Sequence, residues 1–556
     1  MTVLAPYRSS VAPTRPPGFL SLLLAEWTKL RTVRGFLIAL LLVVLLPLGA
    51  TLLSRSSCSV MTVGGSSQSV ACPAAPVGPD GEAVEDSLYF VHQALPANGS
   101  ITAQVTGVTG EYAYSASKPH PPGGSVGGTR VNAAGQLSLA SGTQPWSKVG
   151  IMIKASTSQG SAYAAMLVTG SNGTRMQWDY TGDTAGLSGA VSASSPRWLR
   201  LVRSGSVVTG YDSLNGTTWT EVGSYQVHGL PASGTVQVGL FAASPTHQPF
   251  IGGLEAGPQG PSLATGTFDG VAVSGTSGSG SWKGTAIGSG DGPPIPGGRT
   301  AGSPRSVLSS SYHQTGPGAF TVSGTGEIAP DVPSSPDSIG ASVQVALSGM
   351  FFALVVVIIL GALFAAAEYR RGMIRVTFAA APSRWQVLAA KSAVLFAATF
   401  VVGLIAVGIT LPVGLHMLRA GGNPIDPIPA LTEARMIVGT ALLLAFAAVL
   451  ALAIGTMARR SMLAIVTVIV VIFIPYILAN ATNLLPLSAQ EWLLRALPVA
   501  AFSIQQPYPP YHQVLAQYTP SSGYYPLSPW TGVGVLVLWA AVALAAAGWL
   551  LRRRDV

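Results

Sequence analysis

Six long apolar stretches, separated by polar segments of very different lengths, dominate the sequence. They lie at about residues 36–53, 342–366, 390–416, 436–457, 462–482 and 530–551. A helix of about 20 apolar residues spans the hydrocarbon core of a bilayer, which is roughly 30 Å thick. The pattern therefore predicts a polytopic α-helical membrane protein with six transmembrane helices, of which the last five lie within residues 341–556.

The segment before the first stretch, within residues 1–35, predicts an amphipathic helix at the membrane interface. Leu23, Trp27 and Leu30 recur at spacings of four and three residues, and polar residues occupy the rest of the helical wheel. A helical extension of the first span fits the same pattern. A cleaved signal peptide fits less well, because the basic residues abut the apolar stretch as they do in a retained anchor. The residues that we assign to the interfacial helix are Glu26, Trp27, Lys29 and Arg31.

The region between the first and second stretches, residues 54–340, differs sharply in composition and is rich in Gly, Ser, Thr and Val. Ile101, Ala103 and Val105 alternate with polar residues, which is typical of a half-buried strand. Asn-Gly pairs beginning at residues 98, 172 and 215 fall between apolar runs and predict hairpin turns. We therefore expect a large all-β domain between the first and second helices.

Several motifs within this domain resemble the concanavalin A-like, or laminin-G-like, jelly-roll family. They are Pro145-Trp-Ser-Lys-Val-Gly-Ile-Met-Ile-Lys154, Ser161-Ala-Tyr-Ala-Ala-Met-Leu-Val168, Pro196-Arg-Trp-Leu-Arg-Leu-Val-Arg203 and Asp212-Ser-Leu-Asn-Gly-Thr-Thr-Trp-Thr220. The resemblance covers about residues 85–275 and implies a two-sheet sandwich whose relatives often bind carbohydrate. Its tryptophans are more typical of a sandwich core than of a sugar platform. Residues 276–340 are rich in Gly, Ser and Pro and predict a stalk with one small β-like patch, Ala319-Phe-Thr-Val-Ser323.

The two cysteines, Cys58 and Cys72, both lie at the start of the β-rich region. Outside the cell they can form a disulfide, and closing a loop of this size stabilises the fold by roughly 3 kcal/mol. Two buried free thiols are the alternative.

Charge predicts the orientation of the chain in the membrane. Only 9% of the residues are charged, and the formal net charge is +9. Fifteen of the 30 lysines and arginines lie in the N-terminal segment, the loop 368–391, the Arg459-Arg460 pair and the C-terminal tail. Cytoplasmic loops carry this excess, so we expect both termini in the cytoplasm and residues 54–340 outside the cell. The basic composition thus reports membrane orientation rather than nucleic-acid binding.

The last outer loop, residues 483–529, is long and apolar. The pattern Ser488-Ala-Gln-Glu491 predicts a helix start, and Pro498 predicts its end. This helix fits either a position dipping into the outer leaflet or one lying on the membrane surface.

The sequence lacks the patterns of several enzyme classes. A P-loop requires a lysine after a glycine, and none of the six lysines follows one. No zinc-protease motif is present, and we assign no catalytic or metal-binding residue. A glycan hydrolase needs a pair of carboxylates in a cleft, and the spacing of Asp179, Asp183, Asp212 and Glu221 does not favour one. The interiors of the six stretches lack charged residues, which disfavours an ion-coupled carrier.

Two segments resemble the membrane subunits of ABC-2 type exporters. They are Ala25-Glu-Trp-Thr-Lys-Leu-Arg-Thr-Val-Arg34 before the first span and Glu368-Tyr-Arg-Arg-Gly-Met-Ile-Arg375, followed by Ala381-Pro-Ser-Arg384 and Lys391. The resemblance implies that loop 368–391 is a coupling element for a separate ATPase, which would bind the ATP, and that a second permease half completes the pathway. The coupling residues that it implies are Glu368, Arg371, Gly372, Arg375, Phe378, Pro382, Arg384 and Lys391. The large outer domain departs from the usual short loop of the family.

Our hypothesis is therefore a permease subunit that contacts lipid, a partner ATPase and a second permease half, and that exports a hydrophobic or amphipathic substrate. Its outer domain would bind a glycan or a protein, or guard the exit. The alternative is a membrane-anchored lectin-like or adhesin-like protein. A basic cytoplasmic turn is common to transmembrane hairpins, so loop 368–391 alone does not decide between the two.

Overall fold

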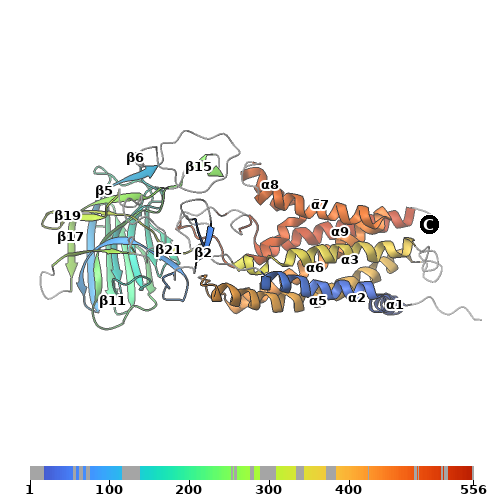
Figure 1. The fold of residues 1–556 in the computed structure, drawn as a ribbon. Coiled ribbons are helices and arrows are strands. Elements are labelled where there is room, and N and C mark those ends of the chain that lie inside the picture. Colours follow the sequence, from blue (N-terminus) through green and yellow to red (C-terminus); the bar gives the residue numbers. More distant parts are fainter. Residues whose placement is uncertain are drawn as a thin grey trace, which may run out of the picture.

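The computed structural model separates the helices from the strands, which lie at opposite ends of the molecule (Figure 1). It describes residues 18–53, 58–61, 67–70, 75–114, 138–248, 250–251, 254–255, 260–275, 281–288, 308–332, 343–370, 383–423, 425–480, 485, 487–514, 518 and 524–553.

Six of the described helices are long and apolar enough to cross a membrane, with mean hydropathy between 2.2 and 2.9. This confirms the predicted number of spans. The helical elements are α1 (Phe19–Thr32), α2 (Arg34–Leu53), η2 (Val343–Leu347), α3 (Met350–Arg370), α5 (Arg384–Ala420), α6 (Ala430–Ala458), α7 (Ser461–Asn480), α8 (Leu487–Ala496), η3 (Pro498–Gln505) and α9 (Pro529–Arg553).

Helix α6 forms the centre of the bundle. The most apolar 18-residue segment of α6 is 72% buried, whereas the corresponding segments of α2 and α7 are 22% and 28% buried. The remaining apolar surface of α2 and α7 faces outward, as expected for helices that contact lipid or another subunit. Small residues allow α3 to approach α6 closely, because a Cβ atom at Gly361 would lie 2.2 Å from the carbonyl oxygen of Ala448.

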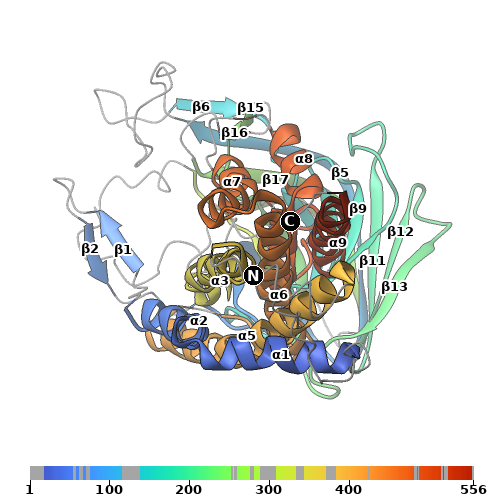
Figure 2. The ribbon, with the colours of Figure 1, turned by 90° about the vertical axis from the view of Figure 1, so that its right-hand side faces the viewer.

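Helix α1 is separate from the first span and lies across the end of the bundle (Figure 2). The chain turns at Val33, whose backbone is extended, so α1 does not continue into α2. Leu20, Leu24 and Trp27 are exposed along one side of α1. This apolar stripe differs from the predicted one, because Leu30 packs inward.

The β-rich region contains two large antiparallel sheets. One has the order β10-β9-β8-β7-β14-β4-β18, and the other β13-β12-β11-β5-β17-β20-β19, with β6 beside β5. The strands of the first sheet are β4 (Leu88–Leu95), β7 (Lys148–Lys154), β8 (Tyr163–Thr169), β9 (Thr174–Trp178), β10 (Gly182–Ala185), β14 (Val236–Ala243) and β18 (Lys283–Ile287). Those of the second are β5 (Asn98–Tyr114), β6 (Ser138–Ser141), β11 (Arg197–Ser204), β12 (Val207–Ser213), β13 (Thr220–Gln226), β17 (Ser262–Ser274), β19 (Ser311–Gly316) and β20 (Ala319–Gly324).

The two sheets form a sandwich around a common core. Ile101, Ala103 and Val105 of β5 point into this core and are fully buried, as their alternation with polar residues predicts. Val238 and Leu240 of β14 meet them from the opposite sheet. The all-β domain between the first and second spans is therefore confirmed.

Two of the three predicted Asn-Gly hairpins are present. The pairs that begin at Asn172 and Asn215 connect β8 to β9 and β12 to β13, and the glycines have φ angles of 69° and 73°. The pair that begins at Asn98 is not a hairpin, because β4 and β5 belong to different sheets. An Asn-Gly pair specifies a tight turn, but it does not specify which sheet the next strand joins.

The predicted stalk at residues 276–340 is wrong over much of its length. Strand β18 pairs with β4, and β19 and β20 extend the second sheet beside β17. Phe320 and Val322 of β20 are buried in the sandwich core. The β-like patch predicted at Ala319–Ser323 corresponds to β20, whereas the high Gly and Ser content concealed β18 and β19. Strand β18 in particular pairs with β4, which is distant in sequence.

Where the chain enters and leaves the sandwich, two short strands pair with each other. They are β3 (Val84–Asp86) and β21 (Ile328–Pro330). The Lys154 Nζ and Asp86 Oδ2 atoms form a fully buried ion pair at 2.8 Å, which fixes β3 to β7. Every residue of β7 and β8 is buried, so the first sheet is covered on both faces. The β3–β21 pair therefore closes the inserted domain at its root.

Four further short strands are described: β1 (Cys58–Met61) pairs with β2 (Ser67–Val70), and β15 (Phe250–Ile251) with β16 (Leu254–Glu255). Cys72 lies outside the described residues, and the side chain of Cys58 is not described. The disulfide between them stays a prediction.

The predicted outer-loop helix is present as α8, which begins one residue earlier than the capping pattern indicates. Pro498 ends the α-helical hydrogen bonding and starts the buried turn η3. Gly532 of α9 packs directly on this turn, since a Cβ atom there would lie 2.1 Å from the Ala500 carbonyl oxygen.

Replacing Gly361 by Ala should destabilise the bundle, because the added methyl group would force α3 away from α6. Overpacking of this kind costs about 1–3 kcal/mol. Gly408→Ala on α5 is a matched control, because nothing lies within 4 Å of a Cβ atom there. Thermal unfolding of the purified protein in detergent should show a lower Tm for Gly361→Ala alone. Equal Tm values for the two variants would contradict the close α3–α6 contact.

Candidate functional site

The predicted coupling loop connects α3 to α5 at the end of the bundle that also carries α1 and the C-terminus (Figure 1). Of the residues implied by the resemblance, Glu368 lies in the last turn of α3, where only its backbone is described. Arg384 and Lys391 lie in the first turns of α5. The residues outside the described part of the chain are Arg371, Gly372, Arg375, Phe378 and Pro382.

The start of α5 is joined to α1 by a buried ion pair. Lys391 Nζ lies 2.9 Å from Glu26 Oε2, and the two side chains are only 6% and 4% exposed. Lys29, one helical turn after Glu26, donates to its other carboxylate oxygen at 2.6 Å. The sequence predicted Glu26 outside the apolar stripe of α1. The structure instead buries it, because Lys391 supplies the opposite charge.

The same lysine also contacts the second span of the bundle. Its ammonium group lies 4.4 Å from the centre of the Phe364 ring on α3, which is a favourable distance for a cation–π interaction. Lys391 therefore joins three helices: α1 through Glu26, α3 through Phe364, and its own helix α5. We did not predict Phe364 as a site residue, and no local sequence pattern distinguishes it from the other apolar residues of its span.

A second contact fixes the start of α5 to the last helix. Arg384 Nη1 donates to the carbonyl oxygen of Leu551 on α9, at 2.5 Å. A cation at the C-terminal end of a helix also interacts favourably with the helix dipole. The neighbouring Trp385 packs on α9 at Gly548, where a Cβ atom would lie 2.2 Å from the ring. The segment that follows the loop is thus held on two sides.

The other two residues assigned to the interfacial helix face away from this contact. Trp27 is 46% exposed and belongs to the apolar stripe of α1, and Arg31 is exposed in the last turn. In a membrane, the tryptophan is suited to the interface between lipid headgroups and acyl chains. Among the predicted residues of α1, the structure therefore gives Glu26 and Lys29 a role in the ion pair.

This arrangement brings four helices, α1, α3, α5 and α9, together at one end of the bundle. The first turn of α5 follows the predicted coupling loop, and Lys391, which binds α1, lies about two turns further along α5. Within the described residues, no group of three or more His, Cys, Asp or Glu side chains could hold a metal ion.

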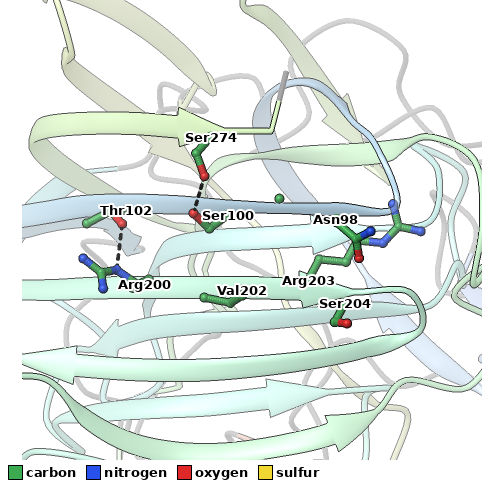
Figure 3. A pocket seen from close by; sticks show the side chains of 9 residues that line it. Asn98, Ser100, Thr102, Arg200, Val202, Arg203, Ser204 and Ser274 are labelled. Carbon is green, nitrogen blue, oxygen red and sulfur yellow. Dashed lines mark hydrogen bonds between the residues drawn. The ribbon is translucent and has the colours of Figure 1, made fainter. Parts of the chain in front are cut away.

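A shallow groove of about 480 Å³ lies on the outer face of the second sheet (Figure 3). Its polar groups largely bond to one another: the hydroxyls of Ser100 and Ser274 are 2.7 Å apart, and Arg200 donates to Thr102 at 3.1 Å. The guanidinium of Arg200 also stacks on the Trp219 ring at 3.9 Å. Since these groups satisfy each other, the groove does not identify a ligand.

Comparisons with known proteins identify one family. The family model described as "ABC-2 family transporter protein" matches residues 20–556. A search of curated proteins found no match.

Two solved structures share 13% sequence identity with the chain. One is a mutant of the GH43 protein BlXynB from Bacillus licheniformis, with a TM-score of 0.16, covering 26% of this chain and 24% of that one. The other is a functionally unknown protein from Saccharomyces cerevisiae, with a TM-score of 0.20, covering 40% of this chain and 97% of that one. At these scores, neither likeness supports a conclusion about fold or function.

Replacing Glu26 by Gln should destabilise the protein, because Lys391 would keep a buried charge without its counter-ion. Removing one partner of a buried pair costs about 3–5 kcal/mol. The matched control is Glu491→Gln in the pair with Arg495, whose side chains are 41% and 42% exposed. Exposed pairs contribute roughly 0–1 kcal/mol.

Thermal unfolding in detergent measures both variants. We expect a clearly lower Tm for Glu26→Gln, with partial recovery in the Glu26→Gln, Lys391→Met double variant, which leaves no buried charge. Similar melting of Glu26→Gln and Glu491→Gln would show that the Glu26–Lys391 pair is not an important contact.

Proposed function

Because the chain belongs to the ABC-2 family of transporter proteins, we propose that it is the permease subunit of an ATP-driven exporter. A separate ATPase subunit binds ATP and acts on the segment 368–391. Movement of this segment tilts α3 and α5 and opens a pathway toward the outer side of the membrane. Family membership supports the role of a membrane transport subunit, and the six membrane-spanning helices agree with it.

The observation that carries the coupling role is the Glu26–Lys391 ion pair. A force applied to the loop by the ATPase would be lost if the start of α5 moved independently of its surroundings. Lys391 binds α1 at 2.9 Å, and Arg384 binds the end of α9 at 2.5 Å. A push on the loop therefore moves α5 together with α1 and α9. Helix α1 lies along the inner membrane surface and guides this movement.

A second permease half completes the pathway in our proposal, either another copy of this chain or a similar subunit. Val401, Ile405 and Ile409 are exposed along one face of α5, at a spacing of four residues. This face and the exposed side of α2 suit contact with lipid or with the second half. The surfaces of the spans are apolar, which is compatible with a hydrophobic or amphipathic substrate.

We place the sandwich outside the cell, with both termini in the cytoplasm of a multi-pass protein of the cell membrane. The sandwich lies at the end of the bundle opposite α1 and the C-terminus (Figure 1). There it stands over the exit, where a glycan or protein ligand could reach it. The alternative, a membrane-anchored lectin or adhesin, is less well supported, because the polar groups of the groove bond to one another.

Reversing two charges of the loop, with Arg371→Glu and Arg375→Glu, should weaken binding of the ATPase at least about tenfold. Juxtaposed like charges at an interface cost several kcal/mol, and 1.4 kcal/mol corresponds to a factor of ten. The measurement is co-purification from native membranes, with identification of the bound nucleotide-binding subunit and its ATP hydrolysis. Arg495→Glu, at the opposite end of the bundle, is the control and should retain the ATPase. Full retention of an active ATPase by the double variant would contradict the proposed coupling.

The proposed orientation predicts which residues a membrane-impermeant maleimide reaches. In a background with both cysteines replaced by Ser, Ser171→Cys on the sandwich should be labelled in intact cells. Arg460→Cys, at the α6–α7 turn, should be labelled only after permeabilisation. Both positions are exposed in the structure, so accessibility within the protein does not distinguish them. The reverse labelling pattern would overturn the orientation.

A further inference from the structure

The sandwich contacts the helical part through a small joint at its root. The backbone N–H of Ala83, just before β3, donates to Asp426 Oδ1 at 2.6 Å. Asp426 lies in the turn between α5 and α6. Gln513, after η3, donates to the carbonyl oxygens of Tyr180 and Thr181 at 2.9 and 3.0 Å. These hydrogen bonds connect the sandwich to two separate loops of the helical part.

Apolar contacts and tyrosines complete the joint. Ala329 of β21 and Val332, two residues after this strand, form a small buried cluster with Val514 of the α8–α9 connection. Tyr508 donates from its hydroxyl to the carbonyl oxygen of Asp426 at 3.0 Å. The joint is thus largely dry, and any charge within it is poorly solvated.

Glu82 is the unusual residue of this joint. It is 6% exposed, and both of its carboxylate oxygens are inaccessible and accept no hydrogen bond. A buried carboxylate without partners carries a large desolvation penalty when ionised. A proton on the carboxyl group removes this charge, so the joint is expected to be more stable with Glu82 protonated.

The charged and titratable groups around Glu82 reinforce this preference. Asp80 of its own turn and Asp426 of the facing loop interact unfavourably with its negative charge. Asp331, beside β21, has the same effect on Asp426. Tyrosines and one histidine complete the surroundings: Tyr163, Tyr180, Tyr511 and His228 around Glu82, and Tyr508, Tyr511 and Tyr524 around Asp426. His228 Nδ1 lies 2.8 Å from Asp80 Oδ1. The positive charge of Arg419 opposes the rise in the pKa of Tyr508.

Burial, followed by the charges of Asp80 and Asp426, raises the pKa of Glu82 from 4.5 to about 7, although the nearby backbone N–H groups of Glu82 and Asp80 oppose the shift. Burial, followed by the charge of Asp331, raises the pKa of Asp426 from 3.8 to about 6, although its bond from Ala83 opposes the shift. If the sandwich separates from the loops, water reaches both carboxyls and their pKa values return toward the ordinary range. Raised values in the docked state mean that docking takes up protons. Docking is therefore strongest below about pH 4.5 and weakens as the pH rises through about 7.

We propose that this joint is a proton-dependent latch, which holds the sandwich on the outer loops when Glu82 and Asp426 are protonated and releases it when they ionise. The pH on the sandwich side of the membrane thereby sets the position of the sandwich over the helical bundle. This inference rests on the contacts of the joint and does not require the proposed ATPase coupling. Failure of either proposal leaves the other in place.

The experiment measures the distance between the two parts in the full-length protein in lipid nanodiscs. Spin labels at Asn215→Cys on the sandwich and Glu491→Cys on α8 report it by pulsed electron paramagnetic resonance, with the native cysteines replaced by Ser. The ratio of docked to undocked protein should fall on the order of a hundredfold between pH 5 and pH 8, since a pKa of about 7 replaces one of 4.5. A distance distribution that is identical at pH 5 and pH 8 would overturn the latch.

Two variants assign the response to the joint. Glu82→Gln should remain docked at pH 8, because it has no charge to expose. Asp426→Asn keeps a side-chain oxygen that can accept the hydrogen bond from Ala83, and it should also remain more docked at pH 8 than the unsubstituted protein. This variant tests the proposal if Glu82→Gln does not fold. Asp269→Asn, an exposed carboxylate on the second sheet, is the control and should keep the full response. An unchanged response in both Glu82→Gln and Asp426→Asn would refute the assignment.

Discussion

The ion pair between Glu26 and Lys391 is the interaction on which the proposed mechanism depends. Two opposite charges that are almost completely buried remain stable only while they stay together, since separating them leaves each one desolvated. The pair therefore makes α1 and the start of α5 move as one body. In the proposed mechanism, the coupling loop precedes α5, so a force on that loop would reach α1 as well as a membrane-spanning helix. The contact with Phe364 extends the same constraint to α3.

Different contacts hold the opposite end of the molecule, where the sandwich lies. The sandwich is an insertion between two spans, and its root is closed by the β3–β21 pair and the buried Lys154–Asp86 ion pair. Below that root, the contact with the helical loops includes Glu82, whose buried carboxylate has no hydrogen-bond partner. One end of the bundle is thus fixed by paired charges, whereas the other is held by a joint whose strength depends on protons. This contrast suits a transporter whose inner end receives force and whose outer end responds to its surroundings.

Local sequence patterns predicted the features that depend on neighbouring residues. The six spans follow from continuous apolar composition, and the strand that contains Ile101 follows from strict alternation. The patterns failed where distant partners decide the outcome. The helical wheel of α1 placed Glu26 outside the apolar stripe but did not indicate its burial, because its partner Lys391 lies 365 positions away. Similarly, β18 lies in a Gly- and Ser-rich segment that was expected to be a stalk, because its partner β4 is distant in sequence. The burial of Glu82 has no local sequence signal, because its turn packs beside a loop that lies far away in the sequence and carries Asp426.

The most direct test of the central claim is a double-mutant cycle on ATP turnover by the complex of this chain with its ATPase. The cycle compares Glu26→Gln, Lys391→Met and the double variant with the unsubstituted protein. If the ion pair transmits the force, each single variant lowers the turnover that depends on the membrane subunit, and the double variant is no worse than the poorer single variant. Turnover that is unchanged in both single variants, or losses that simply multiply in the double variant, would contradict transmission through Glu26 and Lys391.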